Sequence, residues 1–370
     1  MSEIRDHFAG KRVFVTGHTG FKGSWLSLWL AQMGAQVHGY ARTPPTRPSL
    51  FDEAGIAGLL ASHTLGDVRD AASLATAVRN AKPEIVVHLA AQPLVRRSYA
   101  EPRETFETNV MGTVNLLEAV RQADTVRVCL VVTTDKCYEN REWVFPYREN
   151  DPMGGFDPYS ASKGCMELAV SAWRRSFFFP EEIAKHGVSL SSARAGNVIG
   201  GGDWAEDRII PDCIRYLEKG ESILVRNPAA IRPWQHVLEP LSGYLLLAAC
   251  QLQRPAVFAD AFNFGPLASG NATVREIAER VIAGWGAGRW HTLAEETAKP
   301  RDPLHEANYL KLDATKAISL LGWMPQYDVA AAVQKTAQWY RRRHDAGPQF
   351  AAAALCAQQI SDYEKAMGSR

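Results

Sequence analysis

The chain has 370 residues, of which 46% are hydrophobic and 22% are charged, and its formal net charge is +1. This near-neutral balance argues against nucleic acid or a membrane surface as the main partner, and no apolar run is long enough to span a bilayer. The six cysteines are scattered and the histidines show no metal-ligand spacing, so we expect a cytoplasmic protein without a metal site.

The first half of the chain alternates strand-like and helix-like segments. Strands are predicted at residues 11–16, 35–40, 84–90, 126–132 and 188–194. Helices are predicted at residues 24–31, a segment that looks amphipathic, at 112–122, and at 159–179. The alternation predicts an α/β fold with a Rossmann-type doubly wound parallel sheet and helices on both faces.

Beyond Ala195 the pattern becomes less regular. Helices are predicted at residues 209–217, 273–284 and 313–321, and the Ala-rich tail after about residue 345 is also predicted to be helical. We therefore predict a smaller C-terminal α/β lobe that caps the strand ends of the sheet. The predicted division is a Rossmann domain at 1–195 with a returning segment at about 231–264, a lobe at 196–230 and 265–345, and a tail at 346–370.

A glycine-rich turn follows the first predicted strand. Gly17, Gly20 and Gly23 recur at three-residue intervals immediately before the first predicted helix. In this context glycines permit a tight turn, let the backbone approach a pyrophosphate and aim helix N-terminal N–H groups at it. The turn therefore predicts a dinucleotide site. Lys22 inside the turn either contacts the pyrophosphate or points to solvent.

The end of the second predicted strand lacks a usual feature of such sites. An acidic residue about 20 positions after the glycines commonly holds the adenosine ribose 2′-hydroxyl. Here Arg42 follows that strand instead. Arg42 could face a 2′-phosphate, which keeps NADP open beside NAD, or it is a solvated loop residue. Asp67 follows a further short strand and could accept a hydrogen bond from the adenine amino group.

Two short segments predict the chemistry. Tyr159 and Lys163 are four residues apart, so on a helix they share one face. A tyrosine hydroxyl titrates near pH ~10, and a neighbouring ammonium is expected to lower that pKa and make the phenol a usable base. Thr133-Thr134-Asp135-Lys136 follows an apolar strand and presents hydroxyls, a carboxylate and an amine. Together they predict oxidation of a sugar alcohol followed by acid–base chemistry on neighbouring carbons.

These motifs resemble a known family. The glycine turn, His88-Leu89-Ala90-Ala91, Asn109 and the Tyr159/Lys163 pair resemble extended short-chain dehydrogenases/reductases. Thr134-Asp135-Lys136 and the runs 194–204, 231–237 and 305–310 are similar to nucleotide-sugar 4,6-dehydratases, specifically those that act on CDP-glucose. The resemblance covers nearly the whole chain and implies conversion of CDP-glucose to CDP-4-keto-6-deoxyglucose with NAD that is reduced and reoxidised in each turnover. An epimerase, a reductase or a dehydratase for another nucleotide sugar is the alternative.

The resemblance also implies a role for each reactive residue. Tyr159 takes the proton of the 4-hydroxyl, Thr134 holds the 4-oxygen, and Lys163 lowers the tyrosine pKa and hydrogen-bonds the nicotinamide ribose. Asp135 protonates the departing 6-hydroxyl. Lys136 is expected to be the base at C5, although relatives that act on dTDP-glucose carry a glutamate there, and orienting Asp135 is its alternative role. A lysine can act as this base only when it is neutral.

The remaining site residues follow from the same resemblance. The implied cofactor site comprises Gly17, Thr19, Gly20, Phe21, Lys22, Gly23, Arg42, Asp67, Val68, Leu89, Ala90, Ala91, Asn109, Thr133, Tyr159 and Lys163. The implied substrate site comprises Gln92, Thr134, Asn197, Arg208, Arg232 and His305, with Arg232 the first candidate for the diphosphate. A homodimer or a dimer of dimers is expected, formed through helices that include the one bearing Tyr159.

Overall fold

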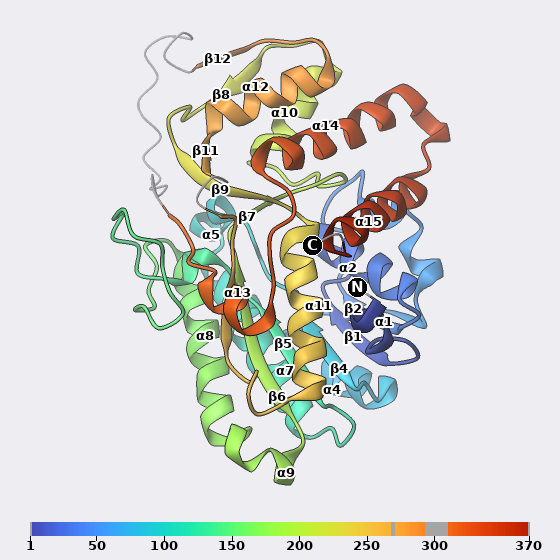
Figure 1. The fold of residues 1–370 in the computed structure, drawn as a ribbon, viewed down its shortest axis with the longest axis vertical. Coiled ribbons are helices and arrows are strands. Elements are labelled where there is room, and N and C mark those ends of the chain that lie inside the picture. The colour runs from blue at the N-terminus through green and yellow to red at the C-terminus, as the bar shows by residue number, and fades with distance from the viewer. Residues whose placement is uncertain (1, 268–270, 293–309, 369–370) are drawn as a thin grey trace.

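A computed structural model of the chain describes residues 2–267, 271–292 and 310–368. Its centre is a seven-stranded sheet in the order β10-β6-β5-β4-β1-β2-β3, and every pair in it is parallel (Figure 1). The strands are β1 (Arg12–Thr16), β2 (Gln36–Ala41), β3 (Ser62–Leu65), β4 (Ile85–His88), β5 (Val128–Val132), β6 (Ser189–Ala195) and β10 (Ala261–Phe264). The predicted Rossmann-type sheet is confirmed.

Helices cover both faces of this sheet. The helices α2 (Phe21–Gln32) and α11 (Leu238–Gln253) contribute to one buried core, and α4 (Ala71–Ala81), α7 (Gly112–Arg121) and α8 (Pro158–Ser176) contribute to another. Strand β5 shows why the chain folds this way. Leu130 and Val132 face the first core while Cys129 and Val131 face the second, so an uninterrupted apolar run is buried on both sides.

Helix α2 differs from its prediction as an amphipathic helix, because residues 23–30 are all buried. The C-terminal helix α15 (Ala352–Gly368) follows α14 (Val329–Ala346) and lies against α2 (Figure 1). The indole of Trp29 donates to Glu364 of α15 at 2.8 Å. The indole of Trp25 donates to the carbonyl of Gly201 at 3.0 Å. The C-terminal helix α15 thus covers part of α2.

The smaller lobe lies beyond the carboxyl ends of the sheet strands, since β6 runs almost directly into β7 (Asn197–Ile199) (Figure 1). One small sheet has the order β11-β9-β7 and another pairs β12 with β8. The remaining strands are β8 (Ile223–Val225), β9 (Ile231–His236), β11 (Asn271–Thr273) and β12 (Trp290–Thr292). Helices α10 (Ile209–Glu218), α12 (Val274–Trp285) and α14 pack together over these sheets.

Short helices complete the described part of the chain. They are α1 (Ser2–Asp6), α3 (Leu50–Glu53), α5 (Val95–Ala100), α6 (Pro102–Phe106), α9 (Ile183–His186) and α13 (Thr315–Leu321). A π-helical turn, Glu107–Met111, joins α6 to α7, and a 3-10 turn, Asp135–Cys137, follows β5. Among the described residues, every helix is too short or too polar to cross a lipid bilayer.

Candidate active site

The glycine turn lies at the point where the order of the sheet reverses. Strand β1 neighbours both β2 and β4, so the chain moves to opposite sides of β1, and ligands of such folds bind in the crevice at that point. Gly17 has φ +75°, and a Cβ there would lie 2.7 Å from the backbone nitrogen of Ala90. A Cβ on Gly23 would overlap the carbonyl oxygen of Gly17. These two positions therefore tolerate only glycine.

The first turn of α2 opens toward this crevice without a side-chain cap. Its N-terminal N–H groups are therefore available to a phosphate, and the helix dipole favours negative charge there. A bare backbone cradle at the switch point, closed to any side chain at Gly17 and Gly23, fits the pyrophosphate of a dinucleotide. The structure thus supports the site that the glycine spacing predicts.

A cavity of about 2100 Å³ extends from this cradle into the cleft below the lobe. It exceeds the ~300–1,000 Å³ of ordinary small-molecule pockets, so there is room for two ligands side by side. Every predicted cofactor and substrate residue outside the range 293–309 lines it except Asn109, and of the predicted catalytic residues only Asp135 does not. His305 lies outside the described residues.

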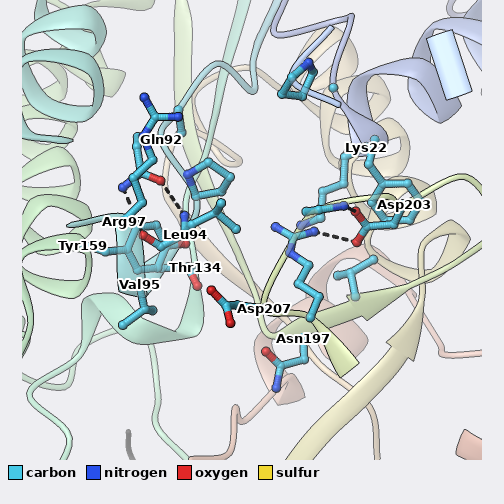
Figure 2. A pocket seen from close by; sticks show the side chains of 18 of the residues that line it. Lys22, Gln92, Leu94, Val95, Arg97, Thr134, Tyr159, Asn197, Asp203 and Asp207 are labelled. Atoms are coloured by element: carbon cyan, nitrogen blue, oxygen red, sulfur yellow. Dashed lines mark hydrogen bonds and ion pairs between the residues drawn. The ribbon is translucent and has the colours of Figure 1, made fainter. Parts of the chain in front are cut away.

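Asn109 does not reach the cavity, contrary to the prediction that it binds cofactor. Its side chain is fully buried, accepts from the backbone of Gln92 at 2.8 Å and donates to Ser162 on α8 at 2.8 Å. Gln92 lines the cavity, but its amide is engaged by Leu94, as Figure 2 shows, and by Thr105. Both residues therefore shape the loop after β4, because a buried amide is kept where all its hydrogen bonds are met.

At the adenosine end, Arg42 is not a free cation. Its guanidinium lies 3.2 Å from Glu104 and 4.0 Å from Asp67. Asp67 itself is bound by Arg69 at 2.7 Å. Two carboxylates thus flank Arg42, and they would repel a 2′-phosphate placed there. This surrounding favours an unphosphorylated ribose.

Helix α8 brings Tyr159 to the cavity in its first turn. Asp157 caps the helix by accepting from the backbone of Ser160 at 2.9 Å, and Pro158 occupies the first helical position. Tyr159 therefore lies near the end of β5, where it forms a hydrogen bond with Thr134. Figure 2 shows these two side chains together on one side of the cavity. The predicted shared face with Lys163 is present, and both residues line the cavity.

The prediction that the neighbouring lysine lowers the pKa of Tyr159 was wrong for the protein without ligands. Burial raises the pKa of Tyr159 above its ordinary value, although the neighbouring Thr134 acts in the opposite sense. Burial also lowers the pKa of Lys163 to about 8. Removing both groups from water disfavours both charged forms, and this outweighs their spacing on the helix. The phenol therefore needs further positive charge beside it before it acts as a base.

Asp135 and Lys136 occupy different depths. Asp135 is buried behind the cavity surface, where Oδ1 accepts from Thr134 at 2.9 Å and Oδ2 has no hydrogen-bond partner among the described residues. The Lys136 ammonium lies 3.7 Å from Oδ1 and lines the cavity. A buried carboxylate oxygen without a partner is costly, and such groups occur where function requires them. Asp135 is therefore a candidate functional residue beside Thr134.

The opposite side of the cavity also carries positively charged side chains. Figure 2 shows Lys22 and the Asp203 pair there, where Arg208 donates to Asp203 at 2.7 Å. Burial, together with Arg208, lowers the pKa of Lys22 to about 7. Arg232 on β9 and Asn197 on β7 also line the cavity. These positive groups lie where the lobe meets the nucleotide cradle, as a diphosphate requires.

Two groups of residues were missed by the sequence reasoning. Asp207 lies 3.7 Å from Arg96 on α5 and 2.8 Å from Arg226, so an ion-pair chain joins the lobe to the sheet domain across the cavity. Glu167 lies next to Thr133, and its carboxylate accepts a hydrogen bond from the Thr133 hydroxyl at 2.5 Å. The available signal for Glu167 was a glutamate four residues after Lys163 in a helix whose neighbouring positions are apolar. The ion pairs of Asp207 with Arg96 and Arg226 join residues far apart in the sequence, so no local sequence pattern indicated them.

Comparisons with known proteins agree with this geometry. The sequence model of the GDP-mannose 4,6 dehydratase family matches residues 14–336. A CDP-glucose 4,6-dehydratase of Salmonella typhimurium is 51% identical over 98% of this chain and 98% of its own. A UDP-glucose 4-epimerase of Halalkalibacterium halodurans is 26% identical over 90% of this chain and 97% of its own.

The crystal structure of DesIV, a dTDP-glucose 4,6-dehydratase from Streptomyces venezuelae with NAD bound, superposes with a TM-score of 0.72. It is 27% identical and covers 92% of this chain and 100% of its own. The family match extends from the first strand of the sheet into the last helix of the lobe. The chain therefore belongs to the GDP-mannose 4,6 dehydratase family.

Proposed function

We propose that this protein is an NAD-dependent CDP-glucose 4,6-dehydratase that forms CDP-4-keto-6-deoxyglucose for deoxysugar biosynthesis. The observation that carries the proposal is the 51% identity, over 98% of both chains, to the Salmonella CDP-glucose 4,6-dehydratase. The arrangement of Thr134, Asp135 and Lys136 beside Tyr159 supports it, because the reaction needs a base at O4, an acid at O6 and a base at C5.

The chain's own residues supply the proton chemistry. NAD, held by the glycine cradle, would supply hydride acceptance and return. Tyr159 takes the proton of the 4-hydroxyl, and Thr134 hydrogen-bonds the same oxygen. The C4 ketone acidifies the C5 proton, which Lys136 at the cavity surface removes when its amine is neutral. Asp135 gives its proton to the departing 6-hydroxyl, and the cations Arg208 and Arg232 hold the diphosphate.

NAD rather than NADP is supported by the surroundings of Arg42. Glu104 and Asp67 flank this guanidinium at 3.2 Å and 4.0 Å. A 2′-phosphate would have to displace two carboxylates, whereas a 2′-hydroxyl can donate to one of them. The same carboxylates neutralise the charge of Arg42.

The rival on the same fold is a 4-epimerase. Epimerisation at C4 needs the tyrosine base but no acid for a 6-hydroxyl, so the buried Asp135 favours dehydration. CDP-glucose carrying deuterium at C4 tests the proposal, because the hydride should reappear at C6 of the same molecule. We expect 4-keto-6-deoxy product with deuterium at C6, analysed by mass spectrometry and NMR.

A panel of CDP-, dTDP-, UDP- and GDP-glucose with NAD or NADP completes this test. The expected result is turnover of CDP-glucose with NAD. Product without deuterium at C6 would contradict the mechanism. Turnover of dTDP-glucose alone would contradict the nucleotide assignment and leave the mechanism standing.

We also propose that two copies pair through α8 and the turn before α7. Leu168 on α8 is 60% exposed and Met111 in the adjacent π-helical turn is 50% exposed. Large apolar side chains gathered on adjoining helices mark an interface. Leu168→Asp should convert the dimer to a monomer, measured by light scattering after gel filtration. Leu320→Asp on α13, where the leucine is 55% exposed, is the matched control and should leave the dimer intact.

The division of the chain stays a proposal as well. We propose a cofactor domain at 1–195 with the returning segment 231–264, and a sugar-binding lobe at 196–230 and 265–345. The pairing of β10 with β6 supports the return to the main sheet. The strand β9 (Ile231–His236) instead pairs with β7 and β11, which favours assigning residues 231–236 to the lobe and starting the returning segment at α11.

A further inference from the structure

A buried carboxylate lies one helical turn beyond Lys163. Glu167 on α8 is 4% exposed, and its two oxygens accept three side-chain hydrogen bonds. Thr133 donates to Oε1 at 2.5 Å, while Ser192 and Arg194 on β6 donate to Oε2 at 2.7 Å and 2.8 Å. The carboxylate is thus held between the end of β5, β6 and α8. Burial of a charge at this depth needs such compensation.

Arg194 is itself anchored. It donates to the Tyr138 hydroxyl at 2.7 Å and to the carbonyl of Glu149 at 2.9 Å, and its guanidinium lies 5.1 Å from the centre of the Tyr138 ring. The Tyr138 hydroxyl donates to Asn263 on β10 at 2.7 Å. Burial raises the pKa of Glu167, but the charge and hydrogen bonds of Arg194, with those of Thr133 and Ser192, lower it overall. Glu167 therefore stays ionised.

Lys163 is the reactive group nearest this carboxylate along α8. Residues four apart on a helix share one face, and both side chains are buried. Burial disfavours the Lys163 ammonium, and Glu167 and Cys137 oppose that effect. Burial also raises the pKa of Cys137 well above its ordinary value, so the thiol carries no charge. The negative charge that acts on Lys163 is therefore that of Glu167.

Other titratable groups surround Lys163 on the elements packed against α8. Burial, with a smaller effect of the Lys163 charge, lowers the pKa of His88 on β4, and burial, with smaller effects of Arg208 and Lys163, lowers that of Lys22 on α2. Neither a lysine nor a histidine side chain carries negative charge, so these two groups do not stabilise the Lys163 ammonium. The groups that face Lys163 from the described elements are Lys22, His88, Cys137, Tyr159 and Glu167.

We propose that Glu167 is a positioning residue that keeps Lys163 as an ammonium ion and fixes Thr133 at the end of β5, so that it sets the pH range in which the enzyme turns over. This inference rests on the proposed function, because it assigns Lys163 a charged role beside Tyr159. Glu167 acts through two neighbours and touches no substrate. The position of Thr133 and the charge of Lys163 are coupled because the same carboxylate accepts a hydrogen bond from Thr133 and attracts the Lys163 ammonium.

The sign of the effect follows from the charges. A carboxylate near an ammonium stabilises the protonated amine. Glu167→Gln removes that stabilisation and leaves the charge of Arg194 uncompensated, so the pKa of Lys163 should fall below its value of about 8. The charged lysine is then lost at a lower pH. We expect the basic limb of the kcat profile to move down by roughly one pH unit.

A titration of Lys163 by NMR in isotope-labelled protein without substrate should show the same downward shift. Ser192→Ala is the matched control, since it removes one hydrogen bond to Glu167 and keeps both charges. It should lower Tm without moving the pH profile, and Glu167→Asp should keep the unmodified profile. If the unmodified protein does not turn over CDP-glucose, the proposed function is refuted. The NMR titration of Lys163 would still test this inference.

A Glu167→Gln protein that loses stability as Ser192→Ala does, with unchanged pH profile and lysine titration, would overturn the proposal. If Glu167→Gln does not fold, the double variant Glu167→Gln/Arg194→Gln removes both buried charges and leaves neither uncompensated. The attraction of Glu167 for the Lys163 ammonium is still lost, so the Lys163 titration should again move to lower pH. An upward or absent shift in that variant would equally refute the inference.

Discussion

Tyr159→Phe should lower kcat for CDP-glucose by roughly 10³-fold, the ordinary size of a lost general base. The variant keeps the ring and removes the hydroxyl that contacts Thr134 at the end of β5. Without it the cavity loses the hydroxyl that is proposed to take the proton of the 4-hydroxyl. Steady-state turnover and the binding of CDP, measured by calorimetry, separate chemistry from affinity. CDP affinity should change little.

Tyr244→Phe is the matched control for this variant. Tyr244 on α11 is also buried, its hydroxyl has no hydrogen-bond partner among the described residues, and it does not line the cavity. Removing an unsatisfied buried hydroxyl should leave kcat within about twofold and the protein at least as stable. Equal losses of turnover in the two variants would show that packing, and not proton transfer, explains the effect of Tyr159→Phe.

Asp135→Asn should separate the steps of the reaction. The amide oxygen can still accept from Thr134, which donates to Asp135 Oδ1 at 2.9 Å, but the side chain can no longer protonate the departing 6-hydroxyl. We expect formation of the 6-deoxy product to fall by roughly 10²- to 10³-fold. Oxidation at C4 and proton removal at C5 should persist. Incubation in D₂O should therefore place deuterium at C5 of CDP-glucose, followed by NMR.

Glu139→Gln is the control for Asp135→Asn, because it neutralises a half-exposed carboxylate four residues away that does not line the cavity. It should leave both product formation and C5 exchange unchanged. If Asp135→Asn abolishes C5 exchange in parallel with product formation, the residue acts before elimination, and its assignment as the acid at O6 is wrong. Lys136→Ala would then distinguish the base, since exchange at a normal rate excludes Lys136 from that role.

Interactions of neighbours in the chain were accessible from the sequence. The glycines at 17, 20 and 23 predict a phosphate cradle because a positive φ and a backbone approach are properties of single residues and short turns. Tyr159 and Lys163 predict a shared face because helix periodicity is local. Uninterrupted apolar runs such as residues 128–132 predict buried parallel strands, and the sheet has them.

The tertiary structure decided what depends on partners far away in the chain. The pKa of Tyr159 is set by desolvation more than by the lysine one turn away, and desolvation comes from everything packed around α8. Asn109 faces Ser162 and the backbone of Gln92, Arg42 faces Glu104, and α2 is covered by the last helix of the chain. Spacing along a chain specifies which side chains can share a face, whereas burial and charge pairing depend on which distant segments come to lie against it.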